Sequence, residues 1–235
     1  VIPVKLTNSA EYRKAETALR EYLQEMEGMS EASISAKMRA EKLVKIEVTK
    51  QLATKGKMQA VREWIDSFLE TGEKLVVFAH HQSVVRELAE AYSAPVIMGD
   101  VSAKQREAAE LAFQTDPECK LIVCNIKAGG VGIDLFAASN VAFVELGWTP
   151  GDHDQAEDRC HRMGQKSSVN AWYFLAEDSV DEMIYGLIEH KRDVVSGATD
   201  GTVNQASVLD DLVATLVFGK MPKQVPSSAL IAEKP

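Results

Sequence analysis

Two arginines and a glutamine are spaced along the chain so that a helix would bring them together. At about 100° per residue, Gln155, Arg159 and Arg162 fall within roughly 60° of one another on one helical face. A guanidinium is permanently charged, and its planar fork matches the oxygens of a phosphate group. These side chains therefore predict a surface that binds a polyanion. The alternative is a solvated charged face, because the carboxylates of Asp154, Glu157 and Asp158 could pair with the arginines.

A glycine-rich segment, Ala128–Asp134, could bring its backbone close to a phosphate. Glycine permits such an approach, although it also serves tight turns that bind nothing. The segment does not match a dinucleotide-binding fingerprint. G-x-G-x-x-G would need a glycine where Leu135 stands and an acidic residue at the end of the next strand.

Two histidines and a tryptophan invite other chemistry. His80 and His81 follow one another on a predicted strand, so they would point to opposite faces, and with no third ligand they do not predict a metal site. Trp148 and Pro150 could form a stacking platform, but we favour an aromatic that positions the loop around it.

From residue 74 onward, short apolar segments alternate with longer helical ones. Nearly all-apolar, β-branched strands separated by helices are typical of a parallel sheet buried on both faces, so we expect an α/β fold. Functional loops follow the carboxyl ends of such strands, which would bring Lys127–Asp134 and Trp148–Asp154 to one edge. The predicted strands are 75–79, 95–98, 120–124, 140–145 and 169–175, and the predicted helices are 82–93, 102–114, 152–163 and 178–195.

Helical segments flank this sheet domain, which we expect over residues 57–195 with a first helix at 58–69. Apolar residues at 3-4-3-4 spacing predict an N-terminal helical extension over 1–56 that packs against the neighbouring domain. Residues 196–235 are expected to form a polar linker at 196–206, a short helix and a disordered tail. The N-terminal apolar stripe consists of Tyr12, Ala15, Leu19, Tyr22 and Met26.

The composition, with 46 % hydrophobic and 26 % charged residues among 235, is typical of a globular protein. The sequence predicts neither a signal peptide nor a membrane helix, since no apolar run approaches ~18 residues. The three cysteines lack paired metal spacing and are interpreted as reduced thiols of an intracellular protein. A net charge of −9 argues against an extended DNA-binding face, because duplex binding depends on Lys and Arg.

The stretch Q-A-E-D-R-C-H-R-M-G-Q at 155–165 resembles the last helicase motif of the Snf2 family, ATP-driven motors of superfamily 2 that move on double-stranded DNA. The resemblance covers residues 50–195, with the motifs in the family's order. Residues 77–81, 145–151 and 181–191 look most like the annealing-helicase branch. The other matching segments are Lys55–Lys57, Lys74–Ala79, Gly99–Ser102 with Arg106, Ala128–Asp134 and Trp148–Pro150.

The resemblance implies a RecA-like fold, a parallel sheet sandwiched by helices, forming the second lobe of a two-lobe motor. Arg159 and Arg162 would then be arginine fingers that reach ATP held by the other lobe, and Gln155 would fix them or contact the nucleotide. Gly130 and Gly132 would let the backbone approach a phosphate or the arginine helix. Asp134 would contact a ribose or hold an arginine.

The resemblance also implies contacts to the DNA backbone. Lys127 stands where the family places a residue facing the DNA, with Asn125 nearby. The alternative for Lys127 is an ordinary exposed side chain, because most lysines are exposed. Ser102 and Arg106 would add contacts from the loop and helix after the second strand. Double-stranded or forked DNA is therefore an expected partner.

Two family features do not occur in this sequence: the phosphate-binding loop G-x-x-x-x-G-K-[ST] and a D-E-x-H-like acidic pair. We therefore expect one half of a DNA-dependent ATPase or helicase, incomplete as this chain alone. An N-terminal RecA-like lobe would carry the phosphate loop and hold most of the Mg²⁺ that accompanies ATP, and the helix after residue 206 would brace the lobes. The alternative is a motor-derived regulatory or docking module without ATPase activity.

Overall fold

The computed structural model divides the chain into two compact units. Among the described residues, the first unit holds 1–2 and 60–174, and the second holds 3–59 and 175–219. The predicted domain limits at 56/57 and 195/196 stay a prediction. The structure describes residues 1–30, 33–130, 132–161, 169–197 and 204–219.

A six-stranded sheet in the order β1-β6-β5-β2-β4-β3 confirms the predicted α/β fold. The pairings β2 with β4, β2 with β5, β3 with β4 and β5 with β6 are parallel. Every residue of β2, β4 and β5 is buried, as expected for a parallel sheet covered on both faces. The strands are β1 (Ile2–Val4), β2 (Leu75–Ala79), β3 (Val96–Ile97), β4 (Leu121–Asn125), β5 (Asn140–Phe143) and β6 (Asn170–Ala176).

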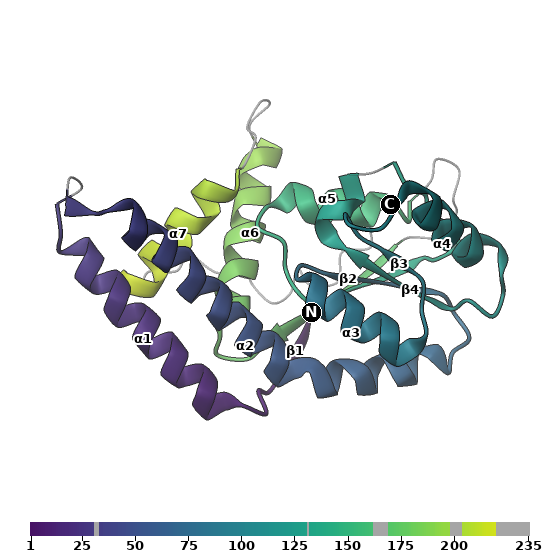
Figure 1. Cartoon of the computed structure of the whole chain (residues 1–235), viewed down its shortest axis with the longest axis horizontal. Helices are drawn as coiled ribbons and strands as arrows, with labels where there is room; N and C mark the ends of the chain where they lie inside the picture. The colour runs from purple at the N-terminus through teal and green to yellow at the C-terminus, as the bar shows by residue number, and fades with distance from the viewer. Residues whose placement is uncertain (31–32, 131, 162–168, 198–203, 220–235) are drawn as a thin grey trace. The chain divides into compact units, whose positions relative to one another are not determined.

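All five predicted strands are present, within two residues of their predicted limits. Strand β1 was not predicted, because three residues are too few to show an alternating pattern. The helices α3 (Gln82–Tyr92) and α4 (Ala103–Thr115) pack against the sheet (Figure 1). Both lie where the sequence predicts them.

A row of aromatic rings ties neighbouring strands together in the first unit. Phe78 on β2 stacks on Phe143 of β5 with ring centroids 5.3 Å apart, and Phe143 stacks on Tyr173 of β6 at 4.6 Å. The three residues are partners in the strand register, so the stack follows directly from the pairing. This row fixes β2 and β5, whose ends lead into the candidate site.

One long helix, which begins in the second unit, is divided wrongly by the sequence. Helix α2 (Ala36–Leu69) runs without a break through Gly56, so Lys55–Lys57 lies inside a helix rather than before one. Gly56 instead permits a close approach: a Cβ there would lie 1.9 Å from Oδ1 of Asn8 and 2.6 Å from Cδ2 of Leu6. Thr7 donates to the Gly56 carbonyl from both its amide and its hydroxyl, each at 3.0 Å.

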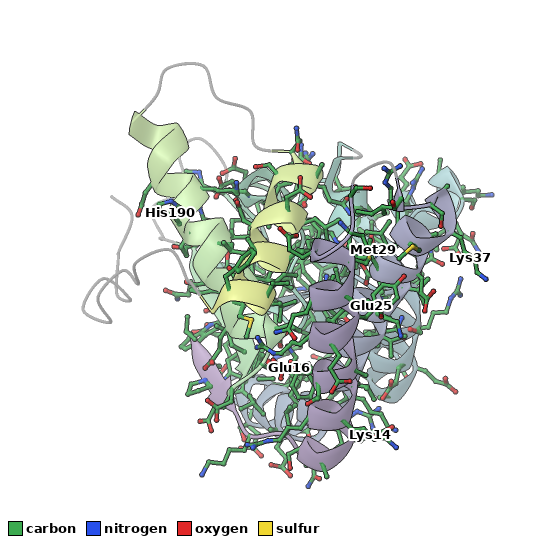
Figure 2. All side chains as sticks on the ribbon, turned by 90° about the vertical axis from the view of Figure 1, so that its left-hand side faces the viewer. Lys14, Glu16, Glu25, Met29, Lys37 and His190 are labelled. Atoms are coloured by element: carbon green, nitrogen blue, oxygen red, sulfur yellow. The ribbon has the colours of Figure 1, made fainter. Side chains whose placement is uncertain are left out.

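Helix α1 (Ser9–Glu27) carries the predicted apolar stripe. Tyr12, Leu19, Leu23 and Met26 are buried, whereas the predicted Tyr22 and Ala15 are only half-buried. The helix packs against α7 (Gln205–Phe218), which also packs against α6 (Val180–Gly197). Charged side chains such as Lys14 and Glu25 point outward from the bundle (Figure 2). No helix among the described residues combines the length and apolarity needed to cross a membrane.

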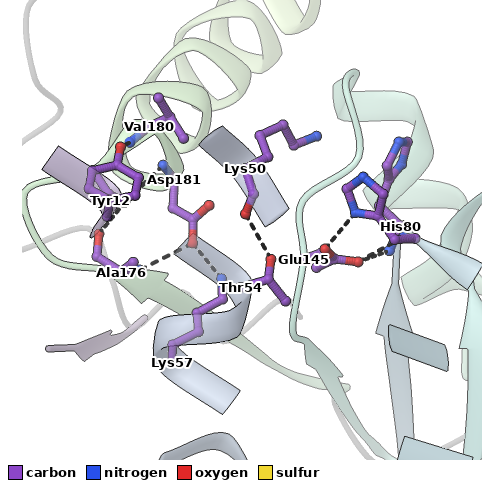
Figure 3. Close-up of polar contacts among 11 residues, drawn as sticks. Tyr12, Lys50, Thr54, Lys57, His80, Glu145, Ala176, Val180 and Asp181 are labelled. Carbon is purple, nitrogen blue, oxygen red and sulfur yellow. Dashed lines mark hydrogen bonds and ion pairs between the residues drawn. The ribbon is translucent and has the colours of Figure 1, made fainter. Parts of the chain in front are cut away.

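A buried ion pair holds the start of α6 to α2 within the second unit. Lys57 Nζ donates to Asp181 Oδ2, and the two side chains are 0 % and 5 % exposed (Figure 3). The same oxygen accepts a bond from the Ala176 amide at 3.2 Å. The Val180 amide, at the first turn of α6, donates to the Tyr12 hydroxyl at 2.8 Å. Three segments distant in sequence are thereby locked together.

Candidate functional site

The loops that follow β2, β4 and β5 all leave the carboxyl edge of the sheet, because the three strands are adjacent and parallel. This is the edge at which ligands bind in open α/β sheets. The short 3₁₀ helix η2 (Ile126–Gly130) follows β4, and α5 (Pro150–Asp158) follows β5. Helix α5 packs against η2, so the two predicted loops are brought together.

A capping box starts α5. Thr149 accepts the Asp152 amide on its hydroxyl at 3.2 Å, Asp152 Oδ2 accepts the Thr149 amide at 3.0 Å, and Pro150 occupies the first turn. Close packing fixes this turn, because a Cβ on Gly147 would lie 2.8 Å from Cβ of Asp152. His153 is fully buried: its Nε2 accepts the Gly147 amide at 3.2 Å, and its Nδ1 donates to the Thr149 carbonyl at 3.0 Å.

Because of this cap, α5 begins two residues earlier than predicted. It also ends at Asp158, so the predicted continuation of the helix through 159–161 is wrong, and residues 162–163 lie outside the described residues. Gln155 is exposed on α5, and Arg159 caps its carboxyl end with right-handed helical dihedral angles. These two predicted residues therefore lie one helical turn apart. Arg162 lies outside the described residues.

Arg159 contacts the glycine-rich segment. Its carbonyl accepts the Leu135 amide at 2.8 Å, and its Nη1 lies 3.5 Å from the Ile133 carbonyl, at the outer limit of a hydrogen bond. Asp134 stands between them and is exposed, and its amide donates to Glu110 of α4 at 3.0 Å. The structure thus brings Arg159 next to the segment that contains Asp134.

Two glycines of that segment were singled out from the sequence. A Cβ on Gly132 would meet nothing within 4 Å, so no packing within the lobe requires glycine there. The space around it is open to an approaching group. Gly130 ends η2, next to the loop that leads to Gly132.

Asn125 and Lys127 are adjacent, but only one of them is exposed. Asn125 ends β4 and is 8 % exposed; its amide donates to the His80 carbonyl at 2.7 Å, and its oxygen accepts the Lys127 amide at 3.0 Å. Lys127 is exposed on η2. The Asn125 side chain therefore orients the loop that carries Lys127.

Ser102 and Arg106 lie at the first turn of α4. Ser102 is the N-cap, with its hydroxyl accepting the Gln105 amide at 3.3 Å and its own amide donating to the Gln105 side chain at 3.2 Å. The spacing Ser-x-x-Gln is a capping-box pattern, so this helix start could have been predicted from the sequence. Ser102 is exposed and Arg106 is half-buried one turn later.

His80 and His81 lie beyond β2, which ends at Ala79. The premise that they point to opposite faces of a strand is therefore wrong, because their rings meet edge to face at 5.1 Å. Among the described residues, no group of three or more His, Cys, Asp or Glu side chains is arranged to hold a metal ion. Trp148 is 2 % exposed, which favours the interpretation that it positions its loop.

Two of the three cysteines are buried near the site. Burial raises the pKa of Cys160, the residue after Arg159, to about 12, and it raises the pKa of the Cys124 thiol well above its usual value. All three cysteines are free thiols. Protonated, buried thiols are poor nucleophiles, so we do not expect covalent thiol chemistry at the carboxyl edge of the sheet.

Comparison with known families places this site in context. The model of the helicase conserved C-terminal domain matches residues 56–164. DNA annealing helicase and endonuclease ZRANB3 of Homo sapiens is 38 % identical over 151 residues, which is 62 % of this chain and 14 % of that protein. SWI/SNF-related matrix-associated actin-dependent regulator of chromatin subfamily A-like protein 1 of Xenopus tropicalis is 36 % identical over 174 residues, 72 % of this chain and 18 % of that protein. The chain spans less than a fifth of these curated relatives.

Solved structures share the fold over more of the chain. The Sulfolobus solfataricus SWI2/SNF2 ATPase core domain gives a TM-score of 0.69 at 23 % identity, covering 92 % of this chain and 47 % of the core. The same core in complex with dsDNA gives 0.64 at 24 %, covering 83 % and 45 %. The chain thus matches about half of each core.

Proposed function

The chain belongs to the Snf2 family as a C-terminal helicase lobe, and we propose that it completes the ATP site of a DNA translocase or annealing helicase. Such a protein would work inside the cell on DNA. The observation that carries the proposal is the contact between the end of α5 and the glycine-rich loop at the carboxyl edge of the sheet. Arg159 bonds there to Ile133 and Leu135, the two neighbours of Asp134, and it lies one turn after the exposed Gln155.

The residues present suit a nucleotide shared with a second lobe. Gly132 leaves room for a phosphate to approach the backbone, and Asp134 offers an exposed carboxylate for a ribose or an arginine. Bound ATP would supply the γ-phosphoryl group, with Mg²⁺ held mainly by the partner lobe that carries the phosphate loop. Gly130, two residues earlier in the same loop, would likewise let the backbone approach the phosphate. These residues bind and orient; none of them is a proton donor in our proposal.

The arginines would stabilise charge. Arg159 is anchored at the end of α5 through its own backbone carbonyl, which accepts the Leu135 amide at 2.8 Å. Arg162 takes the second position of the family motif. A guanidinium that meets the γ-phosphate only in the transition state lowers the barrier without tightening ground-state binding. Gln155, one turn before Arg159, would fix the pair.

The DNA track would consist of a small patch, because the chain as a whole carries a charge of −9. Lys127 is exposed on η2, just after β4, and Asn125 holds its loop. Ser102 and Arg106 extend the track onto α4. We assign Ser102 a contact through the start of a capped helix, whose amides favour phosphate oxygens.

Titration of the chain with a labelled duplex tests this track. We expect weak binding that is independent of sequence and falls steeply between ~50 and ~200 mM salt, as phosphate contacts require. Lys127→Ala should weaken binding and lower the salt slope by about 1. Lys120, which precedes β4 at the other edge and donates to the Gly72 carbonyl at 3.0 Å, provides the control variant Lys120→Ala. Tight, salt-insensitive binding, or equal effects of the two variants, would argue against this track.

A further inference from the structure

One buried carboxylate that has no role so far joins the loops of the site. The side chain of Glu145, two residues beyond β5, is 2 % exposed. Its Oε2 accepts the His80 amide at 2.9 Å and the His81 amide at 2.7 Å, and its Oε1 lies 2.7 Å from Nδ1 of His81 (Figure 3). Three groups therefore converge on one carboxylate, which offsets part of the cost of burying it.

The same histidine turn is bonded to the DNA-track loop. The His80 carbonyl accepts the Asn125 side-chain amide at 2.7 Å, and the oxygen of that side chain accepts the Lys127 amide at 3.0 Å. Since β2 lies between β4 and β5, His80 bonds to both sides: its carbonyl accepts from Asn125 and its amide donates to Glu145. An unbroken series of hydrogen bonds thus leads from Lys127 to Glu145.

On its other side, Glu145 leads directly into α5. Amides of the next few residues are held by the first turn of that helix: Gly147 donates to His153, and Trp148 and Thr149 donate to Asp152 at 3.1 and 3.0 Å. This segment has little freedom to absorb a displacement. Movement of the Glu145 carboxylate would therefore reach the helix that ends in Arg159.

We propose that Glu145 is a positioning residue that couples the Lys127 loop to α5. Contact of Lys127 with DNA would then displace α5 and, with it, Arg159. The inference rests on the proposed function, because it assumes that Lys127 meets DNA. Coupling through a hydrogen-bonded network of this kind changes a measured response by roughly 2- to 30-fold.

A similar polar link at the opposite edge of the sheet provides a matched control. Glu73 accepts the Asn140 side-chain amide at 2.7 Å, and the Asn140 side-chain oxygen accepts the Asn170 side-chain amide at 3.1 Å. This link also joins neighbouring strands through a carboxylate, but it lies at the amino ends, away from both loops. Glu73→Ala should therefore cost stability without affecting coupling.

The test is an NMR titration of the ¹⁵N-labelled chain with duplex DNA at low salt. In the parent, the amides of Lys127, Trp148 and Thr149 should shift with one half-saturation point. In Glu145→Ala the Lys127 shift should remain, while the Trp148 and Thr149 shifts fall by roughly 2- to 30-fold. Glu145→Gln should restore them, because the amide oxygen accepts both backbone bonds and its NH₂ donates to an unprotonated Nδ1 of His81.

The outcomes separate the two proposals. A parent chain in which Lys127 does not respond to DNA overturns the DNA track and, with it, the coupling. If Lys127 responds and the Trp148 and Thr149 shifts survive in Glu145→Ala, only the coupling is overturned. An equal loss in Glu73→Ala would reduce Glu145 to a structural role. Should Glu145→Ala fail to fold, Asn125→Ala breaks the same series at His80 and must give the same loss.

Discussion

Replacing Arg159 with alanine should lower DNA-stimulated ATP turnover by a factor on the order of 10³ in a motor assembled from this chain and an N-terminal lobe. The reason is that an arginine finger stabilises charge that develops mainly in the transition state. Affinity for ATP and DNA should change much less. Turnover, ATP affinity and thermal melting of the same preparation measure the three effects.

The fold should tolerate this change. Arg159 is half-buried, and the bond from its Nη1 to the Ile133 carbonyl is long at 3.5 Å. Arg162→Ala should behave in the same way, and lysine at either position should rescue poorly, since a point charge lacks the planar fork. Arg86→Ala, which removes an exposed arginine paired with Asp100, is the control and should turn over at the parent rate. Near-parent turnover of the Arg159 and Arg162 variants would favour the docking module.

Replacing Lys57 with methionine should destabilise the chain by about 3–5 kcal/mol, because it leaves the Asp181 carboxylate buried without its charge partner. Lys57 is fully buried, and Asp181, at the start of α6, also accepts the Ala176 amide at the end of β6. Denaturant unfolding followed by circular dichroism measures the loss. The double variant Lys57→Met/Asp181→Asn should recover much of it, since asparagine keeps an acceptor for the Ala176 amide and carries no charge.

Lys55 gives a matched comparison two residues earlier on the same helix. Its ammonium lies 3.6 Å from Glu11, but the two side chains are 69 % and 55 % exposed. Lys55→Met should therefore cost less than about 1 kcal/mol. A loss of that size for Lys57→Met as well would show that solvent reaches the Lys57–Asp181 pair.

What the sequence could predict is local or periodic. Strands such as β2 and β4 are short apolar runs, and their parallel pairing follows from the helices between them. The meeting of Arg159 with the glycine-rich loop then follows from strand order, because both lie at the carboxyl edge. The start of α5 could have been predicted too, since Thr149 and Asp152 stand at capping-box spacing.

What escaped prediction depends on partners far along the chain. Glu145 binds a turn 64 residues earlier, and Lys57 pairs with an aspartate 124 residues later. Neither pairing is visible in the hydrophobic periodicity of the sequence. Gly56 looks like a helix break, yet it is a contact point for Asn8 inside a continuous helix. Asn125 looks like a free polar side chain, yet its amide group is engaged by two backbone groups.

Phosphate release is the most direct test of the central claim that this lobe completes an ATP site formed with another. The chain alone should release no more phosphate than a no-enzyme control, with or without duplex DNA. Mixing it with an N-terminal lobe that carries the phosphate loop should produce DNA-stimulated release, and the mixture with Arg159→Ala should lose it by a factor on the order of 10³. Release by the chain alone, in a preparation free of contaminating ATPases, or full release by the mixture with the variant, would contradict the account.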